Sequence, residues 1–184
     1  MANEVLVLAS ASPRRAKILA GMGYRFRIVK TSAHEISLPR EPQRTVVENA
    51  MLKLHAAGAQ PLPVLAADTI VWFDGRIFGK PRDIAEAHDF LRTLGGNVHT
   101  VFTGLAFGSP DGIKTACVES HVKFRQLSDV EIADYIAAVH PLDRAGAYDI
   151  DESGDRIVES YDGSYENIMG LPIEPVRTWL ENLP

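Results

Sequence analysis

The chain has a single cysteine, Cys117, and lacks long uninterrupted apolar runs among its 184 residues. One cysteine can neither form an internal disulfide nor supply a thiolate metal cluster, which excludes disulfide-stapled domains and cysteine-based zinc sites. No apolar run approaches the roughly 18 residues that a membrane span needs. The amino-terminal segment MANEVLVLASASPRR places an acid before a short apolar run and arginines after it, the wrong order for a secretory signal. We therefore expect a cytoplasmic protein that does not enter a membrane.

Several familiar nucleotide and metal motifs are missing. Gly79 and Lys80 resemble the end of a Walker A loop, but Asp74 stands where that loop needs a glycine and Pro81 follows the lysine. There is no GxGxxG fingerprint, GxSxG elbow or CxxC pair, and six histidines are scattered along the chain. These absences exclude the P-loop, the dinucleotide fold, the α/β-hydrolases and a zinc site.

The composition, 46% hydrophobic and 23% charged, is that of a globular protein, and we expect residues 1–184 to form one domain. The net charge of −5 argues against a general nucleic-acid-binding protein. Residues 1–92 carry 13 Lys and Arg against 9 Asp and Glu, whereas residues 93–184 carry 6 against 15. The basic half would attract an anionic ligand; alternatively, the two halves attract each other within the fold.

Strand-like and helix-like segments alternate along the chain. Apolar runs and turn residues predict a strand over 5–9, a helix over 42–58, a strand over 64–73 and a long hairpin over 97–126. Residues 142–170 show little periodicity, so no regular element is predicted there. The alternation predicts an α/β fold with a mixed β-sheet flanked by helices.

A polar cluster follows the first predicted strand, where Pro13 favours the start of a helix. It contains two hydroxyl and two guanidinium groups, from Ser10, Ser12, Arg14 and Arg15. A helix amino terminus offers free N–H groups and the positive end of its dipole, so these groups form a suitable seat for phosphate oxygens. The alternative is that Ser12 caps the helix and the arginines are merely solvated.

Asp68 lies in the middle of an otherwise apolar strand. An ionised, unpaired carboxylate is costly there, so Asp68 needs a metal, a lysine or a raised pKa. Lys53 and Lys80 are candidate partners, and Glu35 could supply a second carboxylate. Two carboxylates and several cations suit a polyphosphate that carries Mg²⁺. A buried Asp–Lys pair without a function is the alternative.

Seven segments occur in the order found in Maf-like proteins and cover nearly the whole chain: LASASPRR, AMLK, AADTIV, GKPRD, GGNVHTVFTG, PLDRAGAYDI and GSYENIMGLP. The chain therefore resembles that family. The resemblance implies a nucleoside triphosphate pyrophosphatase that cuts between the α and β phosphates with Mg²⁺ or Mn²⁺. It also implies an elongated, two-lobed fold with the site in the cleft between the lobes, and often a homodimer.

The resemblance also implies roles for individual residues. The positions that match the family's site are Ser10, Arg14, Arg15, Glu35, Lys53, Asp68 and Lys80. Asp68 takes the place of the proton acceptor and, with Glu35, of a metal ligand. Ser12, beside the phosphate seat, is a further predicted substrate contact.

Members of the family that use dTTP and UTP are similar to this chain at Arg14, at Thr69 and in the stretch DRAGAY, so Thr69 is a predicted substrate contact. Asp151 stands where that subgroup usually has a glutamine. Because an ionised Asp only accepts hydrogen bonds, Asp151 would change the preference for the base. Alternatively, Asp151 lies in a solvated turn and never meets the base.

Together with the resemblance, these residues predict a hydrolase in which Asp68 delivers or deprotonates a metal-held water that attacks the α-phosphorus of a nucleoside triphosphate. The alternative is a nucleotide-binding regulator without turnover, for instance in cell division, to which Maf-like proteins have been linked. A pure binder has less use for a carboxylate beside an anionic ligand, so Asp68 favours the hydrolase.

Overall fold

A seven-stranded mixed sheet forms the centre of the computed structural model, which describes residues 5–182. The strand order is β2-β1-β3-β5-β6-β7, and β4 pairs with β3 off this path. β1 runs parallel to β2 and β3, and the other neighbours are antiparallel. The strands are β1 (Leu6–Ala9), β2 (Phe26–Ile28), β3 (Val64–Phe73), β4 (Arg76–Phe78), β5 (Val98–Ser109), β6 (Gly112–Phe124) and β7 (Val158–Asp162). The expected α/β fold with a mixed sheet is confirmed.

Helices flank this sheet and connect its strands. They are α1 (Pro13–Gly21), α2 (Pro42–Ala56), α3 (Ile84–Leu94), α4 (Asp129–Val139), α5 (Tyr165–Ile168) and α6 (Ile173–Glu181), with short 3₁₀ turns η1 (Pro141–Asp143), η2 (Ala145–Ala147) and η3 (Gly154–Arg156). Within the described residues, none of the helices is long and apolar enough to cross a membrane. The sequence pattern did not predict β7 or α5. β7 is an edge strand whose side chains are mostly exposed and show no apolar alternation, and α5 has only 4 residues.

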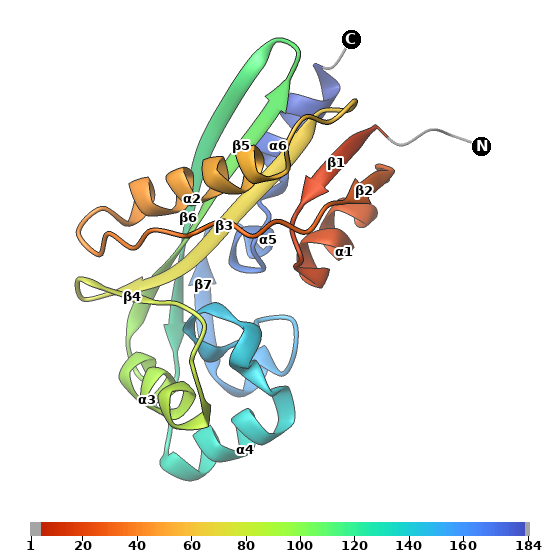
Figure 1. Ribbon diagram of the computed structural model, residues 1–184. Helices are drawn as coiled ribbons and strands as arrows, with labels where there is room; N and C mark the ends of the chain where they lie inside the picture. Colours follow the sequence, from red (N-terminus) through yellow and green to blue (C-terminus); the bar gives the residue numbers. More distant parts are fainter. Residues whose placement is uncertain (1–4, 183–184) are drawn as a thin grey trace.

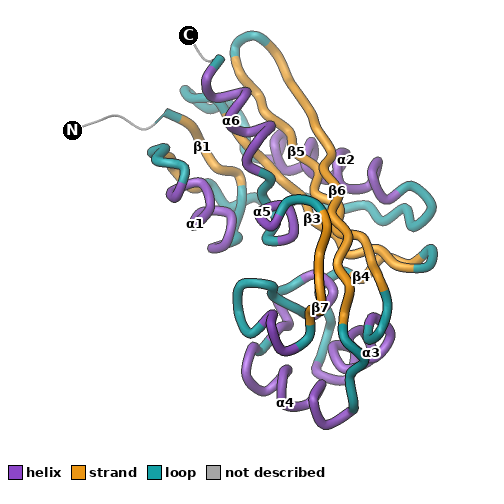
Figure 2. The backbone as a smooth tube through the Cα atoms, turned by 180° about the vertical axis from the view of Figure 1, so that it is seen from behind, coloured by secondary structure: helices purple, strands orange, loops and turns teal. Residues whose placement is uncertain are grey.

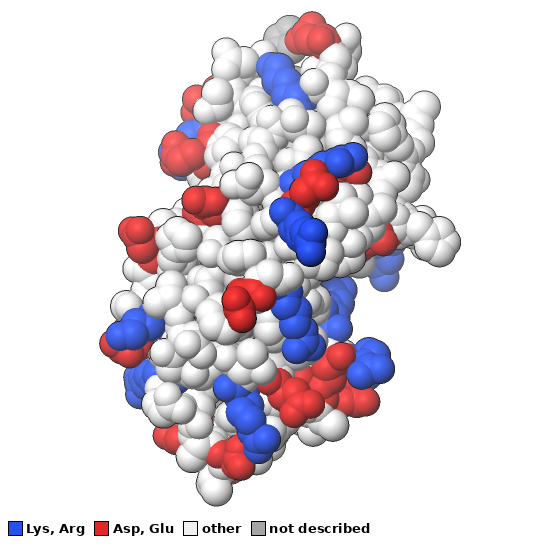
Figure 3. Space-filling model, turned by 90° about the vertical axis from the view of Figure 1, so that its left-hand side faces the viewer, with Lys and Arg blue, Asp and Glu red and all other residues white. Residues whose placement is uncertain are grey.

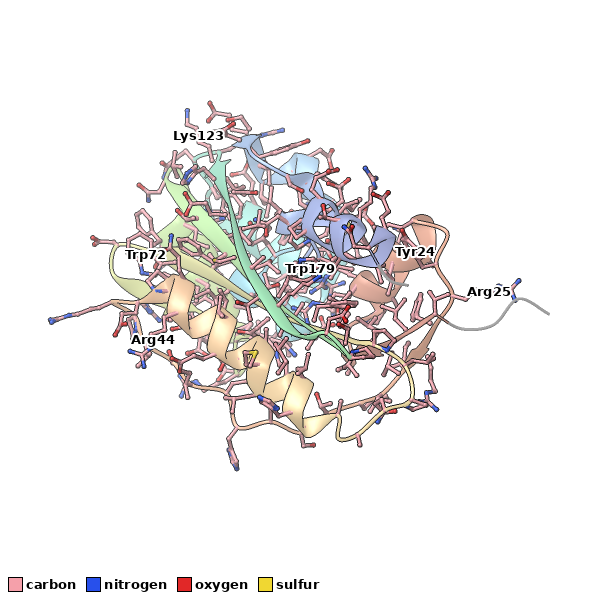
Figure 4. The ribbon with its side chains drawn as sticks, turned by 90° about the horizontal axis from the view of Figure 1, so that it is seen from above. Tyr24, Arg25, Arg44, Trp72, Lys123 and Trp179 are labelled. Carbon is pink, nitrogen blue, oxygen red and sulfur yellow. The ribbon has the colours of Figure 1, made fainter. Side chains whose placement is uncertain are left out.

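Helices cover both faces of the sheet at the end where the chain begins. Side chains alternate between the faces, so Leu65 and Ala67 pack toward α1 and α6, whereas Ala66 packs toward α2. Figures 1 and 2 show α2 on one side and α1 and α6 on the other. In Figure 4, Trp179 lies on α6 against the sheet, where its ring stacks on Phe107 at 5.7 Å between ring centroids. Burial on both faces explains why the central strands read as continuous apolar runs.

The molecule is elongated and has two lobes, as expected (Figure 1). The first lobe comprises α1, α2 and α6 with the strands between them. The second lobe comprises α3 and α4 with the strand ends that they cover, and its separate core contains Phe78, Phe90, Phe124 and Tyr135. β3 and β5 run through both lobes and therefore fix their relative position.

The charges of the two halves of the chain pair with each other. Among residues 5–182, three ion pairs of Lys or Arg join the first half of the chain to the second: Arg14–Asp149, Lys17–Asp151 and Arg92–Asp129. On the face shown in Figure 3, basic and acidic side chains are interspersed. The charge asymmetry of the sequence is therefore partly structural, as the alternative interpretation proposed.

Helix α2 approaches the sheet most closely at Gly104 of β5. A Cβ atom added to Gly104 would lie 2.3 Å from the backbone carbonyl carbon and oxygen of Val46 in α2. Gly104 pairs with Asp68 across the β3–β5 ladder. A strand glycine of this kind permits the close approach of another backbone. The contact sets the height of α2 above the part of β3 that carries Asp68.

We predict that Gly104→Ala lowers the free energy of unfolding by at least about 2 kcal/mol, because backbone rather than a flexible side chain occupies the space that the methyl group needs. The matched control is Gly108→Ala in the same strand, where the three atoms nearest to the new Cβ all belong to the side chain of Leu54, the closest at 3.3 Å. Urea denaturation of both variants measures the difference. Equal stabilities would contradict the close contact.

Candidate functional site

A cavity of about 490 Å³ opens where the sheet is interrupted beside β3. On one side of β3, β1 pairs with residues 64–66 and β4 with residues 71–73. Residues 67–70 have no strand on that side, and the cavity fills this gap. The carboxyl end of β1, where the chain turns into α1, is the usual position of ligand sites in open α/β sheets.

Nine of the ten site residues predicted from the sequence line this cavity: Ser10, Ser12, Arg14, Arg15, Glu35, Lys53, Asp68, Thr69 and Lys80. The tenth, Asp151, lies outside the lining. Both lobes contribute, because Tyr148 and Asp149 of the second lobe complete the wall. The fold therefore brings together groups that are far apart in the sequence.

The start of α1 forms one wall of the cavity. Ser12 caps the helix by accepting a hydrogen bond from the backbone N–H of Arg15, and Pro13 occupies the first turn. The buried Ser10 Oγ accepts hydrogen bonds from the Ser12 N–H at 3.1 Å and from Arg15 Nη1 at 3.3 Å. The hydroxyl hydrogen of Ser10 is left over for an anionic oxygen in the cavity.

Arg15 is held by neutral groups alone. Its guanidinium donates to the Gly170 carbonyl at 2.8 Å, to Thr69 Oγ1 at 3.0 Å and to Ser10 Oγ. No carboxylate of residues 5–182 forms an ion pair with it. Burial lowers the pKa of the Arg15 guanidinium, and the nearby negative charge of Asp68 opposes that effect. Arg15 therefore presents a positive charge that the surrounding residues do not neutralise.

Lys80 supplies a second cation of this kind. It follows β4, whose last residue Phe78 pairs with Val71, and so approaches the gap from the side opposite α1. The Lys80 side chain makes neither an ion pair nor a hydrogen bond with other residues in the described part of the chain. It is free to bind an anion.

The opposite face of β3 carries the carboxylate. Asp68 is 4% exposed; its Oδ1 accepts a hydrogen bond from Lys53 Nζ at 2.6 Å and its Oδ2 accepts one from Asn49 Nδ2 at 3.0 Å. Asn49 and Lys53 lie four residues apart on the face of α2 that rests on the sheet. Each carboxylate oxygen of Asp68 keeps a further acceptor position.

Glu35 joins the same cluster through Lys53. Its Oε1 lies 2.8 Å from Lys53 Nζ, and its side chain is half-exposed at the mouth of the cavity. One ammonium thus faces two carboxylates, which leaves one negative charge to be balanced. Mg²⁺ is usually held by one or two carboxylates together with substrate phosphates and water, and Asp68 and Glu35 fit that requirement. No cluster of three or more His, Cys, Asp or Glu side chains suited to a metal occurs among residues 5–182.

Three further residues support the site and were not predicted. Asn49 also binds the segment that carries Glu35, by donating to the Ile36 carbonyl at 3.0 Å and accepting from the Ile36 N–H at 2.8 Å. Its spacing of four residues from Lys53 is the sequence signal that could have identified it. Tyr148 in the cavity wall contacts the buried His99 Nε2 at 3.0 Å. Burial lowers the pKa of His99 to about 3, so the imidazole stays neutral.

Asp151 pairs with Lys17 on the surface instead of facing the cavity. Its Oδ2 lies 2.6 Å from Lys17 Nζ, and its Oδ1 accepts a hydrogen bond from the Tyr165 hydroxyl at 3.2 Å. The hydrogen bond and charge of Lys17 lower the pKa of the Asp151 carboxyl. A contact between Asp151 and a base would require this ion pair to open.

Comparison with known proteins shows the family of this chain. The family described as Maf-like protein matches residues 5–183. The chain is 42% identical to a protein named dTTP/UTP pyrophosphatase from Shigella dysenteriae and to one of the same name from Escherichia coli K12, in each case over 96% of this chain and 92% of the relative. A protein of that name from Yersinia pestis is 41% identical over 91% of this chain and 87% of its own length. On this match over nearly its whole length, the chain belongs to the Maf-like protein family.

Proposed function

We propose that this protein is a nucleoside triphosphate pyrophosphatase, which hydrolyses the bond between the α and β phosphates to give a nucleoside monophosphate and pyrophosphate. One observation carries the proposal: a single cavity holds a carboxylate pair joined by Lys53 and two cations, Arg15 and Lys80, that have no carboxylate partner in the described part of the chain. Membership of the Maf-like family supports it.

The polyphosphate binds between the start of α1 and Lys80. Arg15 offers a guanidinium that matches phosphate geometry, while Lys80 acts as a point charge from the other wall. Ser10, Ser12 and the first N–H groups of α1 complete the seat. Arg14, the residue before Arg15 in α1, also binds the substrate.

Asp68 takes the proton of the attacking water. Lys53 and Asn49 hold its carboxylate in one orientation, with acceptor positions left on both oxygens. A divalent cation held by Asp68 and Glu35 would lower the pKa of a bound water and neutralise phosphate charge. Lys53 stabilises negative charge that develops on the phosphate groups.

The relatives also indicate which base the nucleotide substrate carries. Their names support dTTP and UTP as substrates of this chain. Asp151 stays a predicted base contact, one that depends on release from Lys17. Mg²⁺ or Mn²⁺ as the metal, a homodimer and a cytoplasmic location also stay predictions.

The proposal is tested by measuring pyrophosphate release from a panel of nucleoside triphosphates with Mg²⁺ and with Mn²⁺. We expect turnover by the natural sequence, with dTTP and UTP among the preferred substrates. We expect Asp68→Asn to lose activity by about 10²-fold or more, because the amide has the shape of the carboxylate but cannot accept the proton.

Circular dichroism of Asp68→Asn controls for folding. Full turnover by that variant would remove Asp68 from the mechanism. Nucleotide binding by the natural sequence without any pyrophosphate would instead support a regulator that acts through binding.

Lys80→Ala should lower kcat/KM for every triphosphate by about 10- to 100-fold, which corresponds to the loss of one hydrogen bond to a charged group. Because Lys80 meets phosphate whichever base is attached, the ranking of the bases should not change. The control is Lys114→Ala, which removes the same charge from the exposed part of β6 outside the cavity. A changed ranking with undiminished total activity would show that Lys80 has another role.

A further inference from the structure

Arg14 differs from its neighbour Arg15 in having a buried carboxylate as its partner. Arg14 Nη1 lies 3.2 Å from Asp149 Oδ2, and the Asp149 side chain is only 5% exposed. The same oxygen accepts a hydrogen bond from Arg144 Nε at 2.9 Å. One carboxylate of the second lobe therefore joins a guanidinium of its own lobe to a guanidinium of α1, across the cavity that both lobes line.

The position of Asp149 is fixed by contacts of its own. The phenol of Tyr135, fully buried in α4, accepts a hydrogen bond from the Asp149 N–H at 3.0 Å and donates to the Asp149 carbonyl at 3.2 Å. Burial raises the pKa of Tyr135 to about 12, so the phenol keeps the proton that it donates. Asp149 Oδ1 accepts a further hydrogen bond from the Asp151 N–H at 3.0 Å. Asp149 is thus rigidly attached to the second lobe.

We propose that Asp149 is the positioning residue that holds the Arg14 guanidinium in its substrate-binding orientation in the cavity. The inference rests on the proposed function of the cavity and adds a residue to it. Fixing a long side chain before the substrate arrives removes the entropy cost of ordering that side chain on binding.

Asp149 holds Arg14 through one nitrogen and leaves the other donors of the guanidinium for the substrate. A guanidinium has five N–H donors, and Asp149 uses one nitrogen of Arg14. The Arg14 side chain is 26% exposed and lines the cavity, so its other donors are available to the substrate. A carboxylate that blocked Arg14 would have to be displaced by the substrate, and its removal would tighten binding instead of weakening it.

The amide of Asp149→Asn cannot reproduce these contacts. The carboxylate uses one oxygen for the Asp151 N–H and the other for both guanidinium groups, whereas an amide has a single oxygen and an NH₂ group that only donates. Whichever way the amide turns, it also loses the negative charge that faces both guanidinium groups, so its hold on Arg14 is weaker than that of the carboxylate. Arg144 still has Asp143 at 2.5 Å and Glu152 at 2.7 Å, so it is not left unpaired and the fold should persist.

The test is a double-mutant cycle of Asp149→Asn and Arg14→Ala, read as KM and kcat for dTTP. We expect Asp149→Asn to raise KM by about 3- to 10-fold with kcat little changed, and to have no further effect on KM once Arg14 is alanine. The matched control is Glu152→Gln, which removes a carboxylate from Arg144 but touches neither Arg14 nor the cavity. Its KM should stay at the natural value.

An unchanged or lowered KM for Asp149→Asn would overturn the proposal. So would an equal rise in KM with and without Arg14, because a merely structural role would not depend on that side chain. The same cycle is also measured by calorimetry as the Kd of a non-hydrolysable dTTP analogue. Absence of turnover would then defeat the proposed function alone, whereas absence of coupling in Kd would defeat the positioning role.

Discussion

The arrangement of the site depends on the close contact between α2 and Gly104. Because Gly104 has no side chain, the backbone of α2 comes down onto β5 directly opposite Asp68. At that height, Asn49 and Lys53 reach the Asp68 carboxylate, and Lys53 reaches Glu35 as well. A buried carboxylate in a central strand is costly unless its charge is met, and the helix meets it. Core packing and the chemistry of the site are therefore set by the same contact.

The second determinant is the interruption of the sheet between β1 and β4. It leaves residues 67–70 of β3 without a strand neighbour at one edge, so that Asp68 and Thr69, which point to opposite faces, border the same cavity. The cations around that cavity differ in their carboxylate partners. Arg15 and Lys80 have no carboxylate partner among the described residues, Lys53 has two, and Arg14 shares one with Arg144. In the proposed function, Arg15 and Lys80 attract phosphate, and Lys53 holds two carboxylates in place in addition to stabilising phosphate charge. Arg14 is itself held by a carboxylate, that of Asp149, and binds the substrate with its remaining donors.

Local patterns in the sequence were enough to predict the mixed sheet, the start of α1 and the grouping of Lys53 and Glu35 with Asp68. These features depend on apolar runs, a Ser-Pro helix start and one carboxylate in an apolar strand, all of which are visible in short segments. Asn49 and Asp149 were missed, since their roles depend on contacts with residues that lie far away in the sequence. Asp151 was predicted from its place in a motif, but its ion pair with Lys17 depends on how α1 meets the second lobe. Sequence position therefore predicted the groups that line the cavity better than the residues that hold them.

The central claim is that this cavity directs water to the α-phosphorus of a nucleoside triphosphate. The most direct test is hydrolysis of dTTP in ¹⁸O-labelled water, with mass spectrometry of both products. The account predicts one ¹⁸O atom in the nucleoside monophosphate and none in the pyrophosphate. Label in the pyrophosphate would mean that water attacks the β-phosphorus, and it would contradict the assignment of the groups around Asp68.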